Sequence, residues 1–397
     1  MARPVVLIAG RDPAEEVGGG HSSYVRAHGL AAIRAGYDPH LFCVSSSAVD
    51  SETEYGFVHR ANRGRIPPRQ VMMRRHAPAL RDAMTGHPDI LERAAAIHGF
   101  SLWTYAATLL DGPVGERPRH VMSMFTTFID EQQAQFDALG RRRFTPVGMR
   151  HWLHLRRAIR TLGALEERAI EWSDTVLVNY RSVRDLVIAQ HPAAREKVVV
   201  GPYGTESMFD SAPDAAPDSR GSPLVVSIAQ QKPKKGGQVL VEALAILRHR
   251  GVPLSAALIG GGEDEHHLRG QVAARRLGDV VEMPGVVGDV GPWLARCGIY
   301  VQPSLREESG SMALLEAMHA GCPVICSGID GMAEDVRDGI DGIHFPPGDS
   351  IALADAIERL AGDAGLRRRL GAAARMRFAE RCAPDRFAAS LQEAYEG

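Results

Sequence analysis

The chain has 397 residues, which is more than one hydrophobic core usually holds, so we expect two domains of about 200 residues each. A formal net charge of −2 argues against a nucleic-acid partner, and the composition is that of an ordinary soluble enzyme. No segment approaches about 18 consecutive apolar residues, and the start MARPVVLIAGRD lacks the features of a signal peptide, so we expect a cytoplasmic protein.

The first half of the chain alternates strands and helices. Residues 5–10 (VVLIAG) predict a strand, Gly18 to Gly20 a tight loop, residues 21–34 a helix and residues 39–44 the next strand. Further strands are predicted at 95–100, 120–125, 174–179 and 197–204. The long insertion between Phe128 and Trp172 has a mainly helical pattern.

The second half follows the same alternation with fewer interruptions. Residues 223–229 predict a strand, and in the following helix Val239, Leu240, Ala243, Leu244 and Leu247 share one face. Further strands are predicted at 256–262, 280–285, 299–304, 323–328 and 342–348. Strands that alternate with helices indicate a parallel sheet with helices on both faces.

The pattern predicts an α/β fold of two doubly wound, Rossmann-like domains that face one another across a cleft. We place the domains at residues 1–205 and 206–378, and we expect a C-terminal helix in 379–397 that packs back on the first domain. The aperiodic segment 211–223, SAPDAAPDSRGSP, is typical of an interdomain linker.

The segment EESGSMALLEAMHAGCPVIC, residues 307–326, has two interpretations. One is a surface loop and an amphipathic helix that ends at Gly321. The other is a sugar-nucleotide site, because Glu308 and Glu316 flank the helix start, where free backbone N–H groups favour an anion.

This segment resembles the E-x7-E element of the large family of retaining GT-B glycosyltransferases that includes glycogen-synthase-like and mannosyltransferase enzymes. Other matches to that family follow in the expected order along the chain. They are the Gly19-Gly20 loop, Gly204 in GPYGTESMF, Lys235-Gly236, IGGGED, VVEMPGVV and GIHFPPGDSIALADAI. The combination is specific, whereas any one glycine pair is not.

The resemblance implies a role for each matching residue. Glu308 is expected at the hydroxyls of the donor sugar, Glu316 at the ribose, Lys235 at the diphosphate and the peptide around Val286 at the base. Gly19 and Gly20 would let the backbone approach the diphosphate closely. The loop and helix start would supply N–H groups to the diphosphate, through Ser309, Gly310, Ser311, Met312, Ala313 and Leu314.

The chain departs from the family's pattern at two places. Gln230 occupies the place of an arginine that binds the diphosphate, and we expect Lys232 to replace that charge while Lys234 points away from the site. The family's N-terminal histidine is also missing. His98 and His120 are candidates to replace it, although a lone histidine beside a strand is more often structural.

A bound catalytic metal is not implied, because no Asp-x-Asp appears. The cysteines favour neither a disulfide framework nor a zinc site, because they are scattered and odd in number. They are Cys43, Cys297, Cys322, Cys326 and Cys382.

The stretch 141–160 is rich in arginine. It has two interpretations: a weak contact with a membrane surface or an anionic acceptor, or a solvated helix face with acidic partners such as Glu166 and Glu167. We prefer the solvated face. A monomer and a homodimer are both compatible with the sequence.

The predicted function is retaining transfer of a hexose-type sugar from a nucleoside diphosphate, UDP rather than GDP, to a hydroxyl acceptor. The acceptor would be a small molecule, a saccharide or a lipid-linked compound. Two alternatives on the same fold are a sugar-nucleotide 2-epimerase and a non-catalytic nucleotide-sugar binding module.

Overall fold

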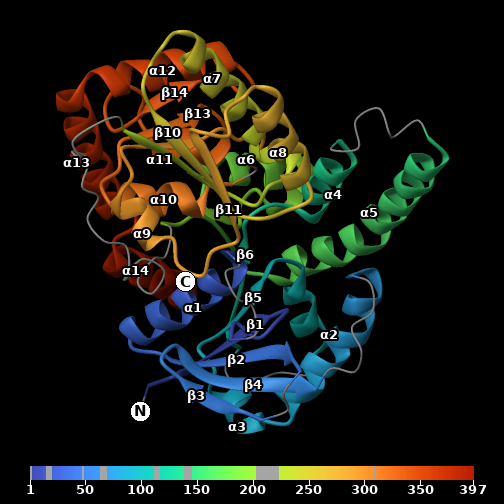
Figure 1. The fold of residues 1–397 in the computed structure, drawn as a ribbon. Coiled ribbons are helices and arrows are strands. Elements are labelled where there is room, and N and C mark those ends of the chain that lie inside the picture. The colour runs from blue at the N-terminus through green and yellow to red at the C-terminus, as the bar shows by residue number, and fades with distance from the viewer. Residues whose placement is uncertain are drawn as a thin grey trace. The chain divides into compact units, whose positions relative to one another are not determined.

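A computed structural model describes residues 2–14, 20–46, 49–62, 69–110, 117–137, 145–202, 223–307 and 309–397. The chain divides into two compact units, one of Met1–Met208 with Cys382–Gly397 and the other of Phe209–Arg381 (Figure 1). Each unit is a Rossmann-like α/β domain built on a parallel sheet, which confirms the predicted fold class. Within the described residues, no helix has both the length and the apolar character needed to cross a membrane.

The sheet of the first unit has the strand order β3-β4-β2-β1-β5-β6-β7-β8, and only β3 runs antiparallel to its neighbour. All six residues of β1 are buried, as expected for a central strand covered on both faces. The strands are β1 (Pro4–Ala9), β2 (Asp38–Ser45), β3 (Ser51–Thr53), β4 (Gly56–Asn62), β5 (Ala96–Phe100), β6 (Arg119–Met124), β7 (Thr175–Val178) and β8 (Val198–Val200).

The strands β3 and β4 are additions to the predicted set. The β4 sequence GFVHRAN has polar residues at both its even and odd positions, so it lacks the apolar run that predicts the other strands. Its place in the sheet comes from the pairing of residues 57–62 with β2, which a local pattern does not reveal.

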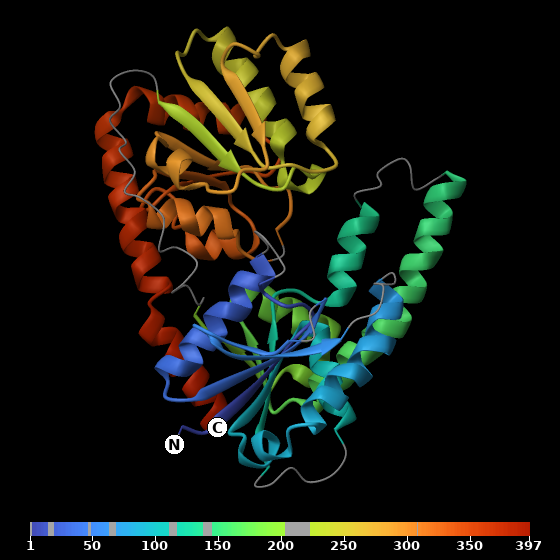
Figure 2. The ribbon, with the colours of Figure 1, turned by 60° about the horizontal axis from the view of Figure 1, so that its bottom comes forward.

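Helices cover both faces of this sheet. On one face α1 (Gly20–Arg34) lies beside the C-terminal helix α14 (Pro384–Glu396), seen in Figure 2 as a blue and a red helix side by side. The other face carries α2 (Arg69–Thr85), α3 (Pro88–Arg93), the 3-10 helix η1 (Ser101–Leu109) and α5 (Pro146–Trp172). Within the described residues, the remaining helices of the unit are α4 (Phe128–Asp137), α6 (Arg181–Gln190) and η3 (Pro192–Ala194).

A buried polar network fastens α14 to the sheet. His98 on β5 contacts the Tyr395 hydroxyl through Nδ1 at 2.8 Å and the Ser123 hydroxyl through Nε2 at 2.8 Å. His28 on α1 reaches the same Ser123 hydroxyl at 3.2 Å. His98 is fully buried, and burial lowers its pKa well below the usual value, so it is a neutral structural residue.

The other candidate histidine is structural as well. The His120 ring stacks on Trp172, with 3.7 Å between the ring centroids, and its Nδ1 contacts the Trp172 carbonyl oxygen at 3.2 Å. These contacts favour the structural interpretation of both histidines, because each has its ring nitrogens or its ring face engaged by neighbouring elements.

The insertion is helical where the structure describes it, as predicted. The N–H of Phe128, at the start of α4, donates to the Glu166 carboxylate of α5 at 2.9 Å, and His191 contacts the same carboxylate at 3.3 Å. In Figures 1 and 2 the green helix α5 extends beyond the sheet of its own unit.

The sheet of the second unit has the strand order β11-β10-β9-β12-β13-β14 and is parallel throughout its described pairs. Its strands are β9 (Leu224–Ile228), β10 (Ser255–Ile259), β11 (Val281–Gly285), β12 (Ile299–Gln302), β13 (Val324–Ser327) and β14 (Ile343–Phe345). Its helices are η4 (Pro233–Lys235), α7 (Gly237–His249), α8 (Glu265–Ala274), α9 (Gly291–Ala295), α10 (Met312–His319), α11 (Asp330–Asp335), α12 (Ser350–Gly362) and α13 (Ala364–Arg381). Every strand predicted in this half is present.

The hydrogen bond between Tyr395 and His98 can be tested by the substitution Tyr395→Phe. It leaves a buried ring nitrogen without its partner, so we expect a loss of about 1–3 kcal/mol of stability and a melting temperature lower by a few degrees in scanning calorimetry. Tyr37→Phe is the matched control, because the Tyr37 hydroxyl donates to Glu396 at an exposed site. It should change stability by less than about 0.5 kcal/mol, and equal effects of the two variants would contradict the assignment.

Candidate functional site

The candidate site lies at the carboxyl ends of two neighbouring strands of the second unit, β9 and β12. From β9 the chain continues to β10 on one side of the sheet, whereas β12 pairs with β9 on the other side. The strand order therefore reverses between β9 and β12, and open α/β sheets bind ligands in the crevice at such a point.

The loop after β9 and the loop after β12 are held against each other by their backbones. The Leu305 N–H donates to the Lys234 carbonyl oxygen at 2.8 Å. Gly236 has φ 72°, and a Cβ atom at this position would overlap the Pro303 carbonyl oxygen. Only glycine fits here, because it both adopts the left-handed conformation and lets the second loop approach.

This approach brings together an ammonium group and a buried carboxylate. The Lys235 Nζ atom donates to Oε1 of Glu307 at 2.5 Å. Glu307 is 6% exposed, and its Oε2 atom is buried with no hydrogen-bond partner among the described residues. Burial raises the pKa of Glu307, and the positive charge of Lys235 opposes that rise.

Glu307 is a site residue that the sequence analysis missed. The predicted carboxylate, Glu308, lies outside the described residues, so its role stays a prediction. Adjacent residues of an extended loop point in opposite directions, and nothing in the local sequence shows which of two neighbouring glutamates faces inward. The signal for Glu307 is its place opposite Lys235, which depends on the pairing of β9 with β12.

The helix α10 begins where the sequence predicts. Ser311 is its N-cap and accepts from the Leu314 N–H at 3.4 Å, so this N–H is already occupied. The Ser311 hydroxyl donates to the Gln302 side-chain oxygen at 3.1 Å. The Ser309 N–H is also engaged, by the Glu307 carbonyl oxygen at 2.7 Å. Of the expected N–H groups, those of Leu314 and Ser309 therefore have partners within the protein.

Glu316 lies on α10, and burial raises its pKa to about 7. Burial is the sole cause of this shift, and no hydrogen bond or ion pair of the Glu316 carboxyl group is found among the described residues. A half-buried carboxyl group without partners is able to accept hydrogen bonds from a ligand that carries hydroxyl groups.

The other predicted donor-binding residues of this unit differ in exposure. Gln230 and Lys232 are exposed, and the side chain of Val286 is 83% exposed. The neighbouring Gln231 is buried instead, and its amide donates to the carbonyl oxygens of Ala229 and Ile259. Gly310, Met312 and Ala313 are half-buried in the loop and first turn of α10.

The remaining predictions concern the first unit and the linker. Gly20 begins α1, whereas Gly19, Gly204 and residues 211–222 lie outside the described residues. Their roles stay predictions.

One acidic partner expected for the arginine-rich stretch 141–160, Glu166, needs correction. Glu166 is buried and binds Phe128 and His191, so it does not neutralise the arginines. Arg150, Arg156 and Arg157 are exposed, as are Met149 and Leu153 on the same helix. Contact of this surface with a membrane stays a prediction, which sedimentation with anionic vesicles would test.

Lys235→Met tests the ion pair in the absence of any ligand. The variant leaves a buried carboxylate uncompensated, so we expect a loss of about 3–5 kcal/mol at about pH 8. The folded-state pKa of Glu307 would then lie further above its unfolded value. The loss should therefore shrink as pH falls through that pKa toward about pH 5, because protonation removes the buried charge.

The double variant Lys235→Met with Glu307→Gln provides the control for this experiment. It contains no buried charge at either pH, so it should recover much of the lost stability and lack the pH dependence. Melting temperatures at both pH values check this, and a pH-independent loss in the single variant would contradict the pairing.

Family models match almost the whole chain in two successive parts. The first, described as Glycosyltransferase Family 4, matches residues 18–207, and the second, described as Glycosyl transferases group 1, matches residues 211–377.

Curated relatives match mainly part of the chain. The phosphatidyl-myo-inositol mannosyltransferase of Mycobacterium leprae is 36% identical over 168 residues, which are 42% of this chain and 44% of the relative. The D-inositol 3-phosphate glycosyltransferase of Streptomyces bingchenggensis is 29% identical over 239 residues, 57% of this chain and 50% of the relative. The chain thus spans about half or less of the length of these relatives.

Solved structures match the fold over its full length. Sucrose-phosphate synthase from Thermosynechococcus elongatus has a TM-score of 0.76 at 20% identity, with 99% of this chain and 98% of that chain covered. HepE of Anabaena, solved in complex with UDP, has a TM-score of 0.69 at 18% identity, with 98% of each chain covered. The two family models and the fold agree: the chain belongs to the GT-B glycosyltransferases, with a family 4 domain followed by a group 1 domain.

Proposed function

We propose that the protein is a retaining glycosyltransferase that moves a hexose-type sugar from UDP to a hydroxyl group of its acceptor. The observation that carries this proposal is the Lys235 ammonium held by buried Glu307 at the strand reversal, beside the start of α10. A nucleoside diphosphate is the leaving group, and its developing charge requires a fixed cation and oriented N–H groups at such a place.

The proposed reaction involves the donor and the acceptor alone, without a further reactant. The bond between the anomeric carbon and the diphosphate oxygen breaks, and a bond to the acceptor oxygen forms on the same face of the sugar. The acceptor proton passes to an oxygen of the departing diphosphate. Lys235 and the N-terminus of α10 would supply the positive charge, so we propose that transfer itself requires no metal ion.

Relatives support the choice of donor and acceptor classes. HepE of Anabaena was solved with UDP, with UDP and glucose and with UDP-glucose. The Mycobacterium leprae relative is by its name a mannosyltransferase that acts on phosphatidyl-myo-inositol. For this chain we therefore propose UDP as the nucleotide, with a small-molecule, saccharide or lipid-linked hydroxyl as acceptor.

A panel of labelled UDP-, GDP-, ADP- and dTDP-sugars, each with and without acceptors and with EDTA, tests the proposal. Transfer to an acceptor with retained anomeric configuration, measured by proton NMR of the first product, is the expected result. Turnover of donor without acceptor would identify an epimerase instead, and binding without turnover would identify a binding module.

The two adjacent glutamates should differ in their effects on the reaction. Glu308→Gln is expected to lower kcat by about tenfold or more with little change in UDP affinity, because the resemblance places this carboxylate at the sugar. Glu307→Gln removes the negative charge that holds the Lys235 ammonium, so it should instead weaken UDP binding or lower the stability of the folded protein. Steady-state kinetics and calorimetry with UDP separate these effects, and near-normal turnover of folded Glu308→Gln would remove Glu308 from the site.

The pKa of Glu316 leads to a pH-dependent affinity for the donor. If the ionised carboxylate accepts hydrogen bonds from the ribose, binding lowers its pKa from about 7, and affinity rises with pH until the free carboxyl is ionised. Calorimetry with UDP-glucose should show a gain of about tenfold between about pH 6 and pH 8. Glu316→Gln should abolish that dependence, and identical pH profiles of the two proteins would contradict the contact.

A further inference from the structure

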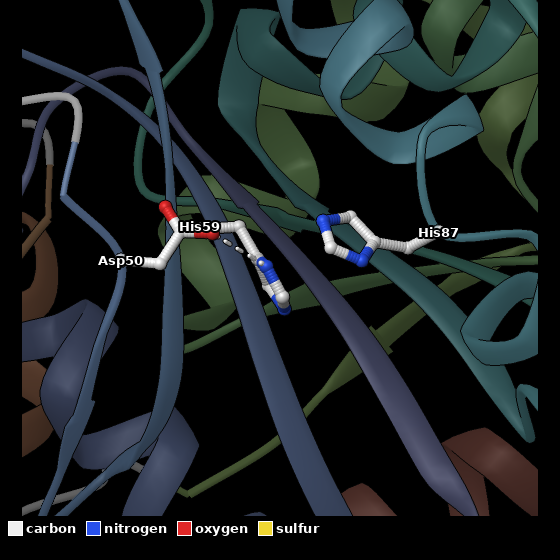
Figure 3. A group of neighbouring side chains, drawn as sticks. All are labelled: Asp50, His59 and His87. Atoms are coloured by element: carbon white, nitrogen blue, oxygen red, sulfur yellow. Dashed lines mark hydrogen bonds and ion pairs between the residues drawn. The ribbon is translucent and has the colours of Figure 1, made fainter.

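A group of histidine and aspartate side chains lies at the β3–β4 edge of the first unit, apart from the residues proposed for sugar transfer. His59 is on β4, Asp50 directly precedes β3, and His87 connects α2 with α3. One ligand atom of each residue lies within 4.8 Å of the others. Figure 3 shows the His59 ring between the Asp50 carboxylate and the His87 ring.

The position of His59 follows from strand register and packing. His59 pairs with Phe42 of β2, and its ring stacks on the Phe42 ring with 4.4 Å between centroids. The His87 ring packs against both of these rings. Its centroid lies 4.3 Å from that of His59 and 5.9 Å from that of Phe42. His59 is 4% exposed, so its ring has little freedom to turn away from Asp50 and His87.

The side of His59 that faces away from Asp50 is also engaged. Its Nε2 atom lies 3.0 Å from Nδ1 of His40, and Nε2 of His40 lies 3.5 Å from the Asp38 carboxylate. The Nδ1 atom of His59 lies 3.3 Å from Oδ2 of Asp50, to which its N–H donates when no metal ion is bound. A metal ion at Nδ1 would replace that proton, and His59 would then donate through Nε2 to His40. A metal-ligating histidine usually donates its other ring N–H to a partner that orients the imidazole, and His40, itself in contact with Asp38, would have that role for His59.

The carboxylate of the group has a fixed orientation. Asp50 is held in place by the Arg60 N–H, which donates to its Oδ1 atom at 2.8 Å and leaves Oδ2 toward His59.

We propose that Asp50, His59 and His87 bind a divalent transition metal ion of the zinc class, with His40 and Asp38 orienting His59. Two imidazoles and one carboxylate are a donor set that suits zinc, and bonds of about 2.0–2.2 Å require the ligand atoms to approach one another by roughly 1 Å. The fourth position is left to water. The site would tie the edge strands β3 and β4 to the α2–α3 connection and is separate from the transfer chemistry proposed above.

The 397-residue chain, treated with EDTA and dialysed, should be titrated with zinc chloride alone in a calorimeter. We expect one zinc ion per chain and a melting temperature that rises with zinc and falls again with EDTA. Cobalt chloride should give the absorption bands of a four-coordinate site. Because no nucleotide or sugar is present, the result is independent of whether sugar transfer occurs.

Two variants remove a ligand with little change in shape. His87→Phe keeps a ring against Phe42 and His59, and Asp50→Asn keeps the oxygen that accepts from Arg60. Each should weaken zinc affinity by about a hundredfold or more, since even the loss of an orienting residue costs about tenfold to a hundredfold. His249→Ala, at an exposed histidine of the second unit, is the control and should bind zinc as the unmodified protein does.

Absence of stoichiometric zinc binding would overturn the proposal, and so would unchanged affinity in Asp50→Asn and His87→Phe. Circular dichroism shows whether the His87→Phe protein is folded. If it is not, the affinity of Asp50→Asn decides the question alone.

Discussion

The candidate site depends on the close approach of two loops at Gly236. Because the Pro303 carbonyl oxygen occupies the space of a side chain at this position, the loops after β9 and β12 lie in direct contact. That contact places the Lys235 ammonium on the Glu307 carboxylate. A buried carboxylate is costly without a cation, so Lys235 is held in the site before any ligand arrives. The proposed diphosphate would therefore share the Lys235 ammonium with Glu307.

The neighbouring polar groups reinforce this arrangement. The Gln302 side-chain oxygen accepts from the hydroxyl groups of both Tyr300 and Ser311, which joins the end of β12 to the N-cap of α10. Buried hydrogen bonds of this kind have few alternatives, because an unpaired polar group inside the protein is expensive. The helix start, the lysine loop and the buried carboxylate thus form one pre-organised unit on a rigid sheet.

Histidines have different surroundings on the two faces of the first unit. On the α1 and α14 face, His28 and His98 share the Ser123 hydroxyl, and the Tyr395 hydroxyl occupies the remaining nitrogen of His98. Their hydrogen-bonding capacity is used within the protein. On the opposite face, His59 and His87 lie against each other and beside a carboxylate, an arrangement that a metal ion would complete. The difference lies in the kind of partner: tyrosine and serine hydroxyl groups contact His98, whereas a carboxylate and other histidines lie beside His59.

The sequence alone determined the strands and helices with strong periodicity, the parallel α/β fold class, and the helix start at Ser311, because these depend on residues close together in the chain. It identified Lys235 and Glu316 as site candidates through motif spacing.

Only the tertiary structure showed that Glu307 is the partner of Lys235 and that Glu166 is buried away from the arginines. It also added β4 to the sheet. It also brought Asp50, His59 and His87 together. In each case the deciding contact joins residues from different elements of the chain. Burial in turn depends on which strand ends meet, and a local sequence pattern carries no information about that.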